Sequence, residues 1–338
     1  MTRTTPGLFD VQVNGFAGVD FNDVALTPQA FDHALQAMLA TGVTQVLPTL
    51  ITADAATLAA RFKALDHAVK QTPLAQTMVP GYHLEGPFLN PQPGFSGCHP
   101  ASAMIAPDIQ LVDRLQAELS KPILLTTIAP ELPGSIEFIK QARTRHMAVA
   151  IGHSDARRDV ITAAVEAGAT FATHLGNGVA HQMHKFDNPI VAQAVEDRLW
   201  GCFIVDGIHV PSDALKMLLR TKSLEKSILV TDAVSAAASP AGHYPFAGMR
   251  VERAADGSVR DIGTPYLAGS SLTMDQGIRN LIHFGLCSFD EAIRLGSDNP
   301  RKAFLECGIA IADPGSVTWS ADHRIVETRL NGEILYKK

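Results

Sequence analysis

The feature that most constrains the fold of this chain is a repeated alternation between short β-rich runs and segments with helical spacing. Eight such runs occur, at residues 8–14, 45–50, 78–86, 123–129, 147–154, 169–177, 200–209 and 227–234. Several are almost continuously apolar, as expected of strands covered by helices on one side and filled by a barrel core on the other. Helix start signals lie between them: Thr27 and Pro28 precede a helix expected at residues 29–40, and Asp54 precedes one at 55–69. Eight βα units in series predict an α/β fold, a (β/α)8 TIM-type barrel, with a doubly wound open sheet as the alternative.

The pattern changes after the eighth run. Residues 236–263 are rich in Gly, Ala and Pro and contain a hairpin pattern around Asp256-Gly257. Helical segments are expected at residues 273–284, 288–297 and 300–307. The last residues alternate polar and apolar around Asn331-Gly332, which predicts a β element too short to fold alone. We therefore divide the chain into a barrel with its closing helices at residues 7–315 and a reduced β appendage at residues 316–338.

Composition narrows the class of protein. The formal net charge of −6 argues against partners held by non-specific attraction, so neither nucleic acid nor membrane is expected. With 46% hydrophobic and 18% charged residues, the chain has enough core-forming side chains to fold. The sequence shows neither an apolar run of about 18 residues nor a signal-peptide pattern at its beginning, so we expect a cytoplasmic protein. The four cysteines lack CxxC spacing, which predicts reduced thiols.

Polar side chains gather where six of the eight predicted strands end. They are Gln12 and Asn14 from the first run, Glu85 from the third, His153 from the fifth, His174 from the sixth, His209 from the seventh and Asp232 from the eighth. Catalytic groups of a (β/α)8 enzyme sit at the carboxyl ends of its strands. A purely structural barrel does not need polar groups there, so the pattern favours an enzyme.

One carboxylate and two imidazoles among these side chains form a metal-ligand set. Glu85, His153 and His174 match the donors that zinc or a similar divalent ion accepts while keeping a position for water. Asp232 would then deprotonate or orient that water and return the proton to a leaving group. Taken singly, a strand histidine is as well explained as a satisfied core residue, and Asp232 as a helix cap. Their joint placement on four strand ends favours the functional interpretation for all four.

Two loops carry further candidates. His99 follows Gly97-Cys98 in a Gly/Pro-rich loop at residues 90–100, where it is either a solvated loop residue or reaches over the barrel mouth to a substrate. His209 has the same two interpretations. Lys185 lies with two histidines in the loop after the sixth strand, where the alternatives are a charged surface and an anion-binding site.

At these residues the chain resembles the N-acetylglucosamine-6-phosphate deacetylases of the amidohydrolase superfamily. The matching segments are residues 10–15 (DVQVNG), 83–88 (HLEGPF) with 97–99 (GCH), 152–154 (GHS), 173–177 (THLGN), 206–209 (DGIH), 229–233 (LVTDA) and 267–274 (LAGSSLTM). They occur in the family's order from about residue 7 to the end of the chain.

The resemblance implies a reaction and a role for each matching residue. The reaction is hydrolysis of the N-acetyl amide of N-acetylglucosamine-6-phosphate, or of a close N-acetylhexosamine phosphate, to the amino sugar phosphate and acetate. Glu85, His153 and His174 would hold one divalent metal ion, zinc or alternatively iron, and Asp232 would be the catalytic acid and base. The implied substrate contacts are Cys98, His99, Asn177, Gly178, Lys185, His209, Leu267, Ala268 and Gly269, with Gln12 and Asn14 beside the metal ligands. His99 and the metal would stabilise the oxyanion.

Two departures from the family pattern concern the site. Superfamily members with two metals carry His-x-His on the first strand, whereas this chain has Gln12-Val13-Asn14, and neutral amides are poor metal ligands. We therefore expect one catalytic metal. The family usually places a phosphate-binding arginine eleven residues after the sixth-strand histidine, often across a dimer interface, and that position is Lys185. Because lysine binds phosphate as a point charge without arginine's fork, an unphosphorylated or different N-acyl amino sugar stays open as the substrate.

A third departure concerns the appendage. Family chains begin with several strands that join the C-terminal strands in a small β-sandwich, but here the first barrel strand starts almost at once. The appendage would therefore come mainly from residues 316–338, with its apolar face covered by the barrel or by another subunit, and we expect a homodimer.

Two other functions remain as alternatives. A different amidohydrolase, such as a cyclic amide hydrolase, would be expected to carry a lysine at the end of the fourth strand, where residues 126–130 contain none. A non-catalytic sugar-binding protein on the same scaffold predicts loss of Asp232 or of a ligand, and none is lost.

Overall fold

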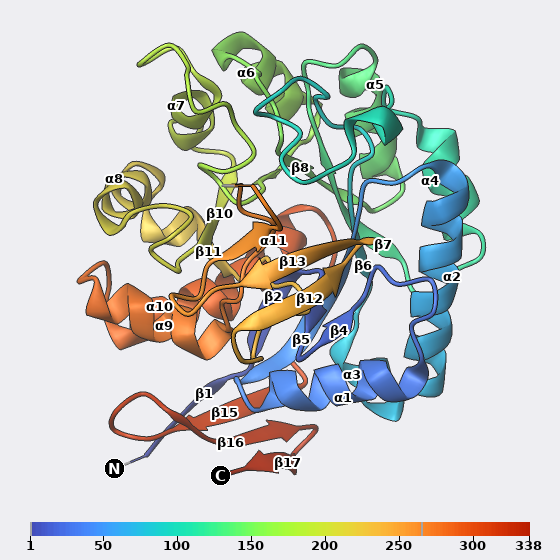
Figure 1. The fold of residues 1–338 in the computed structure, drawn as a ribbon. Coiled ribbons are helices and arrows are strands. Elements are labelled where there is room, and N and C mark those ends of the chain that lie inside the picture. Colours follow the sequence, from blue (N-terminus) through green and yellow to red (C-terminus); the bar gives the residue numbers. More distant parts are fainter. Residues whose placement is uncertain (1, 265) are drawn as a thin grey trace.

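A barrel of eight parallel strands occupies the centre of the computed structural model, which describes residues 2–264 and 266–338 (Figure 1). In barrel order the strands are β2 (Leu8–Val13), β5 (Val43–Ile51), β6 (Tyr82–Glu85), β7 (Ile123–Ile128), β8 (Ala148–Ile151), β9 (Phe171–Ala172), β10 (Trp200–Ile204) and β11 (Ser227–Val230). The ring is closed beyond β11, where the Asp232 N–H donates to the Gln12 carbonyl at 3.0 Å and the Asn14 N–H donates to the Ala233 carbonyl at 2.7 Å. Seven of the predicted runs contain one of these strands, and the run at 45–50 lies inside β5, so the (β/α)8 barrel is confirmed.

Helices cover the outside of the barrel. They are α1 (Pro28–Leu39), α2 (Ala55–Gln71), α3 (Pro73–Met78), α4 (Ile109–Gln116), α5 (Ser135–Thr144), α6 (Arg158–Ala167), α7 (Pro189–Ala194), α8 (Ser212–Lys222), α9 (Met274–His283), α10 (Phe289–Gly296) and α11 (Asp298–Glu306), with 3-10 turns η1 (Ala101–Ala103) and η2 (Leu224–Lys226). The predicted start signals act as N-caps: Thr27 accepts from the Ala30 N–H, and Asp54 accepts from the N–H groups of Ala56 and Thr57.

Seven of the eight strands are shorter than their predicted runs, and two local features account for several of these differences. Residue 78, expected in the third strand, belongs to α3, because Pro73 supplies the backbone angle of a helical first turn. β6, β8, β9 and β11 stop within two residues of a residue with positive φ, which an extended strand does not contain. His153, His174 and Asp232 have φ of 51°, 29° and 51°, and each lies two residues beyond the end of its strand.

The barrel interior is apolar at the end where the strands begin. Phe304 of α11 closes that end, with its ring centroid 5.9 Å from that of Phe9 and 5.2 Å from that of Phe171. The polar side chains lie at the opposite end. The barrel interior is therefore closed and apolar at one end, and open and polar at the end that holds the candidate site residues.

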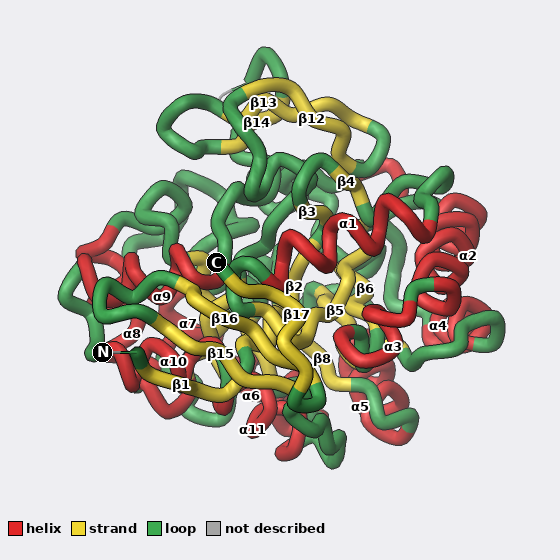
Figure 2. Tube along the Cα trace, turned by 90° about the horizontal axis from the view of Figure 1, so that it is seen from below, coloured by secondary structure: helices red, strands yellow, loops and turns green. Residues whose placement is uncertain are grey.

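A separate antiparallel sheet lies across the lower face of the barrel (Figure 2). Its strands, in order, are β1 (Arg3–Pro6), β15 (Gly315–Trp319), β16 (Ile325–Leu330) and β17 (Glu333–Lys337). The expectation that no strand precedes the barrel is wrong, because β1 pairs with β15 from Arg3 opposite Trp319 to Pro6 opposite Ser316. The barrel covers the sheet, and the Thr328 hydroxyl donates to the carbonyl of Leu39 in α1 at 2.8 Å. The division of the chain at residue 316 stays a prediction.

Trp319 is the main anchor of this sheet. Its side chain is 1% exposed, its Nε1–H donates to the Thr5 hydroxyl at 2.9 Å, and its ring meets Phe289 edge-on. We expect Trp319→Ala to lower the free energy of unfolding by about 3–5 kcal/mol, because a large buried aromatic is lost and a cavity remains. Urea denaturation measures this, with Leu335→Ala at a 41% exposed position as the matched control, for which less than about 0.5 kcal/mol is expected. Equal effects of the two variants would show that the sheet is not anchored through Trp319.

A third sheet packs over the open end of the barrel. It contains β12 (Gly242–Phe246), β13 (Met249–Arg253) and β14 (Val259–Asp261), so the predicted hairpin is present with one further strand. Its apolar side chains pack on Ile51 and Val234, at the carboxyl ends of the barrel strands. The short pair β3 (Gly15–Phe16) and β4 (Val19–Asp20) lies beside it.

Two findings concern the predictions made about membrane spans and about the cysteines. Among the described residues, no helix combines the length and apolar character that crossing a membrane requires. The four cysteines, all within the described residues, are free.

Candidate active site

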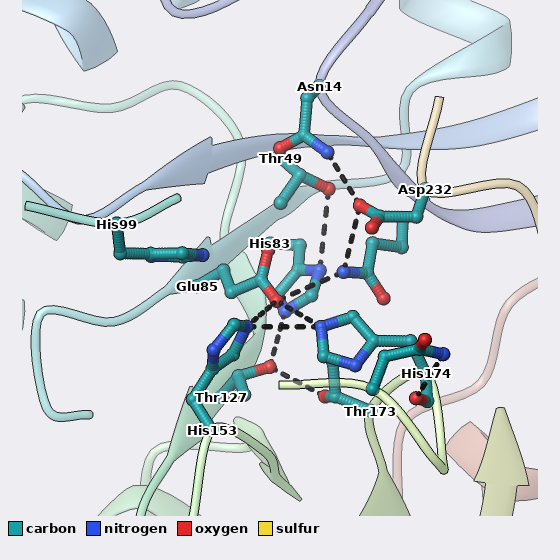
Figure 3. Close-up of polar contacts among 12 residues, drawn as sticks. Asn14, Thr49, His83, Glu85, His99, Thr127, His153, Thr173, His174 and Asp232 are labelled. Carbon is teal, nitrogen blue, oxygen red and sulfur yellow. Dashed lines mark hydrogen bonds and ion pairs between the residues drawn. The ribbon is translucent and has the colours of Figure 1, made fainter. Parts of the chain in front are cut away.

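Three ligand atoms from three different strands converge at the open end of the barrel (Figure 3). His174 Nε2 lies 3.1 Å from Glu85 Oε1 and 3.2 Å from His153 Nε2, and His153 Nε2 lies 3.6 Å from Glu85 Oε1. All three side chains are at most 6% exposed. The structure therefore brings together the three residues that the sequence predicted as metal ligands.

The spacing and the chemistry of these atoms fit a divalent metal ion. Ligands about 2.0–2.1 Å from a tetrahedral zinc lie about 3.3 Å from one another, close to the three distances here. His153 Nδ1 donates to the carbonyl of Phe95 at 2.7 Å, so Nε2 is the ring nitrogen that faces the triangle as a ligand. Electron pairs from a carboxylate and imidazoles thus face one another at close range, and a cation satisfies them together.

His99 offers a second possible ligand set. Glu85, His99 and His153 also have ligand atoms within 4.8 Å of one another. The set with His174 is the tighter one, because all of its separations are 3.6 Å or less. His99 Nδ1 is within 2.9 Å of the Thr52 hydroxyl, and its ring centroid is 4.5 Å from that of His153. This places His99 beside the metal ligands, at the edge of the site.

Asp232 is held beside the metal ligands by two amides. Its Oδ1 accepts from Asn14 Nδ2 at 2.8 Å and from Gln12 Nε2 at 3.2 Å, and the same Gln12 nitrogen donates to Glu85 Oε1 at 3.1 Å. Both bonds to Asp232 end on Oδ1, which leaves Oδ2 available to another group. The two amides predicted to lie beside the metal ligands therefore act as donors to the carboxylates.

Burial and mutual contact shift the pKa values of the site residues. Burial and the nearby charge of Glu85 raise the pKa of Asp232 to about 7. Burial also favours protonation of Glu85, but its contacts with His153 and His174 outweigh that and hold its pKa well below the usual value. Burial lowers the pKa of His99 to about 3, with His153 adding to the effect, so His99 is neutral.

A hydrogen-bonded chain of side chains forms the floor beneath these groups (Figure 3). His83 Nε2 contacts the Thr127 hydroxyl at 2.8 Å, which contacts the Thr173 hydroxyl at 2.8 Å, and His83 Nδ1 lies 3.4 Å from the Thr49 hydroxyl. Burial lowers the pKa of His83 to about 4, so a neutral ring lies between Thr49 of β5 and Thr127 of β7. The floor lies below the ligands and links the neighbouring strands β5, β6 and β7 with Thr173 at the end of β9.

Two groups of loop residues that were predicted to contact the substrate lie beside the site. Asn177 donates to the His174 carbonyl at 3.0 Å, and Gly178 lies so near His153 that a Cβ there would be 2.8 Å from Nδ1. The predicted turn at residues 267–269 runs against Asp232, where a Cβ on Gly269 would be 3.2 Å from the Asp232 carbonyl oxygen. Asn177 and Gly178 therefore border the metal ligands, and the turn borders Asp232.

Cys98, His209 and Lys185 differ in their surroundings. Cys98 packs with the apolar cluster under the three-stranded sheet, and burial, then the charges of Asp232 and Glu85, raise the pKa of its thiol. His209 Nδ1 lies 2.6 Å from Asp206 Oδ2. Lys185 is on an exposed stretch of the loop after β9, so in the single chain the structure does not bring it into the buried site.

Sequence reasoning passed over several residues that shape the site. Thr52 and Thr127 carry no pattern of their own, because a threonine in an apolar run is also typical of a strand. Glu131 was detectable, since it lies three residues after the fourth strand and strand-end polarity had identified the other site residues. It accepts from Ser154 and from the Asp155 N–H beside the metal ligand His153.

Asp10 is a buried carboxyl just below the site and makes stability depend on pH. It accepts from the Thr231 hydroxyl, and burial raises its pKa from 3.8 to about 7. Since the folded state binds this proton more tightly, its contribution is full below about pH 4 and is lost as pH rises through 7, about 4 kcal/mol in all. Relative to wild type, Asp10→Asn should gain stability between pH 5 and pH 8, as measured by urea unfolding at each pH. Asp213→Asn, at an exposed position, is the control, and a constant difference between wild type and Asp10→Asn would contradict the assignment.

Comparisons with known proteins agree with this geometry. No protein-family model matches the chain. A curated relative from Lysinibacillus sphaericus, named N-acetylglucosamine-6-phosphate deacetylase, is 30% identical over 337 residues, covering 96% of this chain and 81% of the relative. A relative from Escherichia coli O157:H7, named N-acetylgalactosamine-6-phosphate deacetylase, is 32% identical over 298 residues, covering 88% and 77%. A solved mutant of N-acetyl-D-glucosamine-6-phosphate deacetylase from Mycobacterium smegmatis, in complex with N-acetyl-D-glucosamine-6-phosphate, has a TM-score of 0.89 at 28% identity, covering 99% of this chain and 87% of that chain.

The fold and the comparisons together define a class of enzyme. A (β/α)8 barrel with a carboxylate and two imidazoles converging at its strand ends, and with these relatives, is a hydrolase of the amidohydrolase superfamily. The chain belongs to the N-acetylglucosamine-6-phosphate deacetylase family. The resemblance seen in its sequence motifs is thereby confirmed.

Proposed function

We propose that this enzyme hydrolyses the N-acetyl amide of N-acetylglucosamine-6-phosphate, or of a close N-acetylhexosamine phosphate, to the amino sugar phosphate and acetate. The observation that carries the proposal is the convergence of Glu85, His153 and His174 within 3.6 Å of one another, with Asp232 held beside them. The named activity of the relatives supports the same reaction.

One divalent ion at Glu85, His153 and His174 would complete the site. When bound, such an ion supplies Lewis-acid polarisation of the acyl oxygen and makes water more acidic. Zinc and ferrous iron both suit one carboxylate and two imidazoles. A single ion is supported by Gln12 and Asn14, because both amides donate to carboxylates through their nitrogens.

Asp232 is the group that moves the proton. Gln12 and Asn14 fix its Oδ1, so Oδ2 is the oxygen that takes a proton from the attacking water. The same oxygen returns the proton to the amide nitrogen as the carbon–nitrogen bond breaks, which makes the departing group a neutral amine. A pKa raised to about 7 suits a group that must accept and donate a proton near neutral pH.

His99 is placed to stabilise the oxyanion. Because burial keeps its ring neutral, it donates from Nε2 only if the Thr52 hydroxyl donates to Nδ1 across their 2.9 Å contact. The proposed role of His99 therefore depends on Thr52, whose single hydroxyl proton goes either to His99 Nδ1 or to the Glu85 carbonyl 3.4 Å away.

We assign attraction of the substrate's phosphate to His209 and Lys185. His209 borders the site, and Lys185 lies on an exposed loop, from where it would reach a phosphate across the interface of a homodimer. We place the enzyme in the cytoplasm, where sugar phosphates are kept, and expect its partner to be a small amino sugar substrate.

Acetate release from four sugars tests the proposal. The sugars are N-acetylglucosamine-6-phosphate, N-acetylgalactosamine-6-phosphate and the two unphosphorylated sugars. We expect a phosphorylated sugar to give the highest kcat/KM, by a moderate factor, because lysine replaces the phosphate-binding arginine of the family. Equal or higher kcat/KM for an unphosphorylated sugar would favour the alternative of a different N-acyl amino sugar, and no release from any of the four would refute the reaction.

A further inference from the structure

A half-buried carboxylate outside the ligand set joins the loops after three consecutive strands. Glu131, after β7, accepts from Asn90 Nδ2 at 2.8 Å and from the Asp155 N–H at 2.7 Å through Oε1. Its Oε2 accepts from the Ser154 hydroxyl at 2.6 Å. Asn90 lies in the loop after β6, and Ser154 and Asp155 lie in the loop after β8, so one side chain ties three loops together.

All three groups that donate to Glu131 belong to residues next to the metal ligand His153 in the chain or hydrogen-bonded to it. Ser154 and Asp155 directly follow it, and the Asn90 N–H donates to its carbonyl at 3.1 Å. His153 needs such support because its φ is 51°, a backbone conformation that costs about 1–3 kcal/mol in a residue other than glycine. The contacts of Glu131 oppose relaxation of this turn into an extended conformation that would turn the imidazole away from the site.

The same contacts hold the loop that orients the imidazole ring. Asn90 begins the stretch at residues 90–100, and its side-chain oxygen accepts from the Gln92 N–H at 2.9 Å. Farther along this stretch, the Phe95 carbonyl accepts from His153 Nδ1 at 2.7 Å, and His99 stands over the His153 ring. Glu131 therefore supports both the backbone of His153 and the hydrogen-bond acceptor that sets its tautomer.

We propose that Glu131 is a positioning residue for the metal site, which acts by holding His153 in its binding orientation without contacting the ion. The proposal rests on the metal site of the proposed function. Removing a residue that supports a metal ligand without touching the metal typically weakens the protein's affinity for that metal by about 10- to 100-fold.

Two substitutions separate position from charge. Glu131→Ala removes all three contacts. Glu131→Gln keeps them, because its oxygen still accepts from Asn90 and Asp155, and its amide nitrogen donates to Ser154, whose hydroxyl also serves as an acceptor. The control is Glu137→Ala, at an exposed position on the neighbouring helix α5.

The test is the Zn²⁺ dissociation constant of chelator-stripped protein, measured by competition with a chromogenic chelator. We expect Glu131→Ala to raise the constant about 10- to 100-fold, and Glu131→Gln and Glu137→Ala to leave it within about threefold of wild type. An unchanged constant in a folded Glu131→Ala protein would overturn the proposal, as would equal weakening in Glu131→Gln, which would assign the effect to charge. If Glu131→Ala does not fold, Ser154→Ala removes one contact, and an unchanged constant there has the same consequence.

The outcome is distinguishable from failure of the proposed function. Wild type that binds Zn²⁺ but releases no acetate refutes the reaction and leaves the role of Glu131 standing. Wild type that binds no Zn²⁺ refutes both.

Discussion

Asp232→Asn should lower kcat by about 10³- to 10⁴-fold while the metal stays bound. Asparagine keeps the shape of the side chain, and its oxygen still accepts from Asn14 and Gln12. The amide oxygen is not basic enough to take a proton from water, so the contribution of general acid–base catalysis is lost. Steady-state acetate release measures kcat, and elemental analysis of the same sample measures the bound metal.

The matched control for this variant is Asp213→Asn, at an exposed position in the first turn of α8. It should keep wild-type kcat. Full turnover by the Asp232→Asn protein with one metal bound would show that another group moves the proton, and the mechanism proposed here would have to be abandoned.

His174→Ala should abolish tight metal binding and lower kcat/KM by at least about 10³-fold, because several kcal/mol of charge stabilisation depend on the metal. His99→Ala is the informative companion, since the two histidines belong to different candidate ligand sets. We expect it to keep one equivalent of metal and to lose only the contribution of its own hydrogen bond to the oxyanion, about 10²- to 10³-fold in kcat.

Metal content by elemental analysis decides between the two ligand sets. If His99→Ala lost the metal and His174→Ala retained it, the ligands would be Glu85, His99 and His153, and the triangle at His174 would need another explanation.

The strand-end pattern of the sequence predicted most of the site because barrel topology brings the carboxyl ends of the strands to one place. Glu85, His153 and His174 follow apolar runs that are far apart in the chain, and eight parallel strands leave them no other common location. The relation of Gln12 and Asn14 to Asp232 follows from the same closure of the barrel.

The parts that could not be predicted depend on backbone conformation and on distant pairing. Positive φ at His153 and His174 ends β8 and β9 early, and an apolar run carries no signal of that conformation. The strand at residues 3–6 is polar and short, so only its backbone pairing with β15 reveals it. The tautomer of His99 likewise depends on Thr52, which lies 47 positions away in the sequence.

Glu131 illustrates a different kind of miss. The rule that identified Glu85 and Asp232 applies equally to the loop after the fourth strand, where Glu131 is a carboxylate that supports a metal ligand without belonging to the ligand set. Side chains that support a ligand from outside the coordination sphere are found only when every strand end is examined for hydrogen-bond acceptors as well as for ligands.

The most direct test of the account is a metal titration of activity. Chelator-stripped protein receives increasing Zn²⁺, and acetate release from N-acetylglucosamine-6-phosphate is measured at each ratio. One metal held by Glu85, His153 and His174 predicts activity that rises linearly to one equivalent and then stays constant. Activity that continues to rise to two equivalents, or no acetate at any ratio, would contradict it.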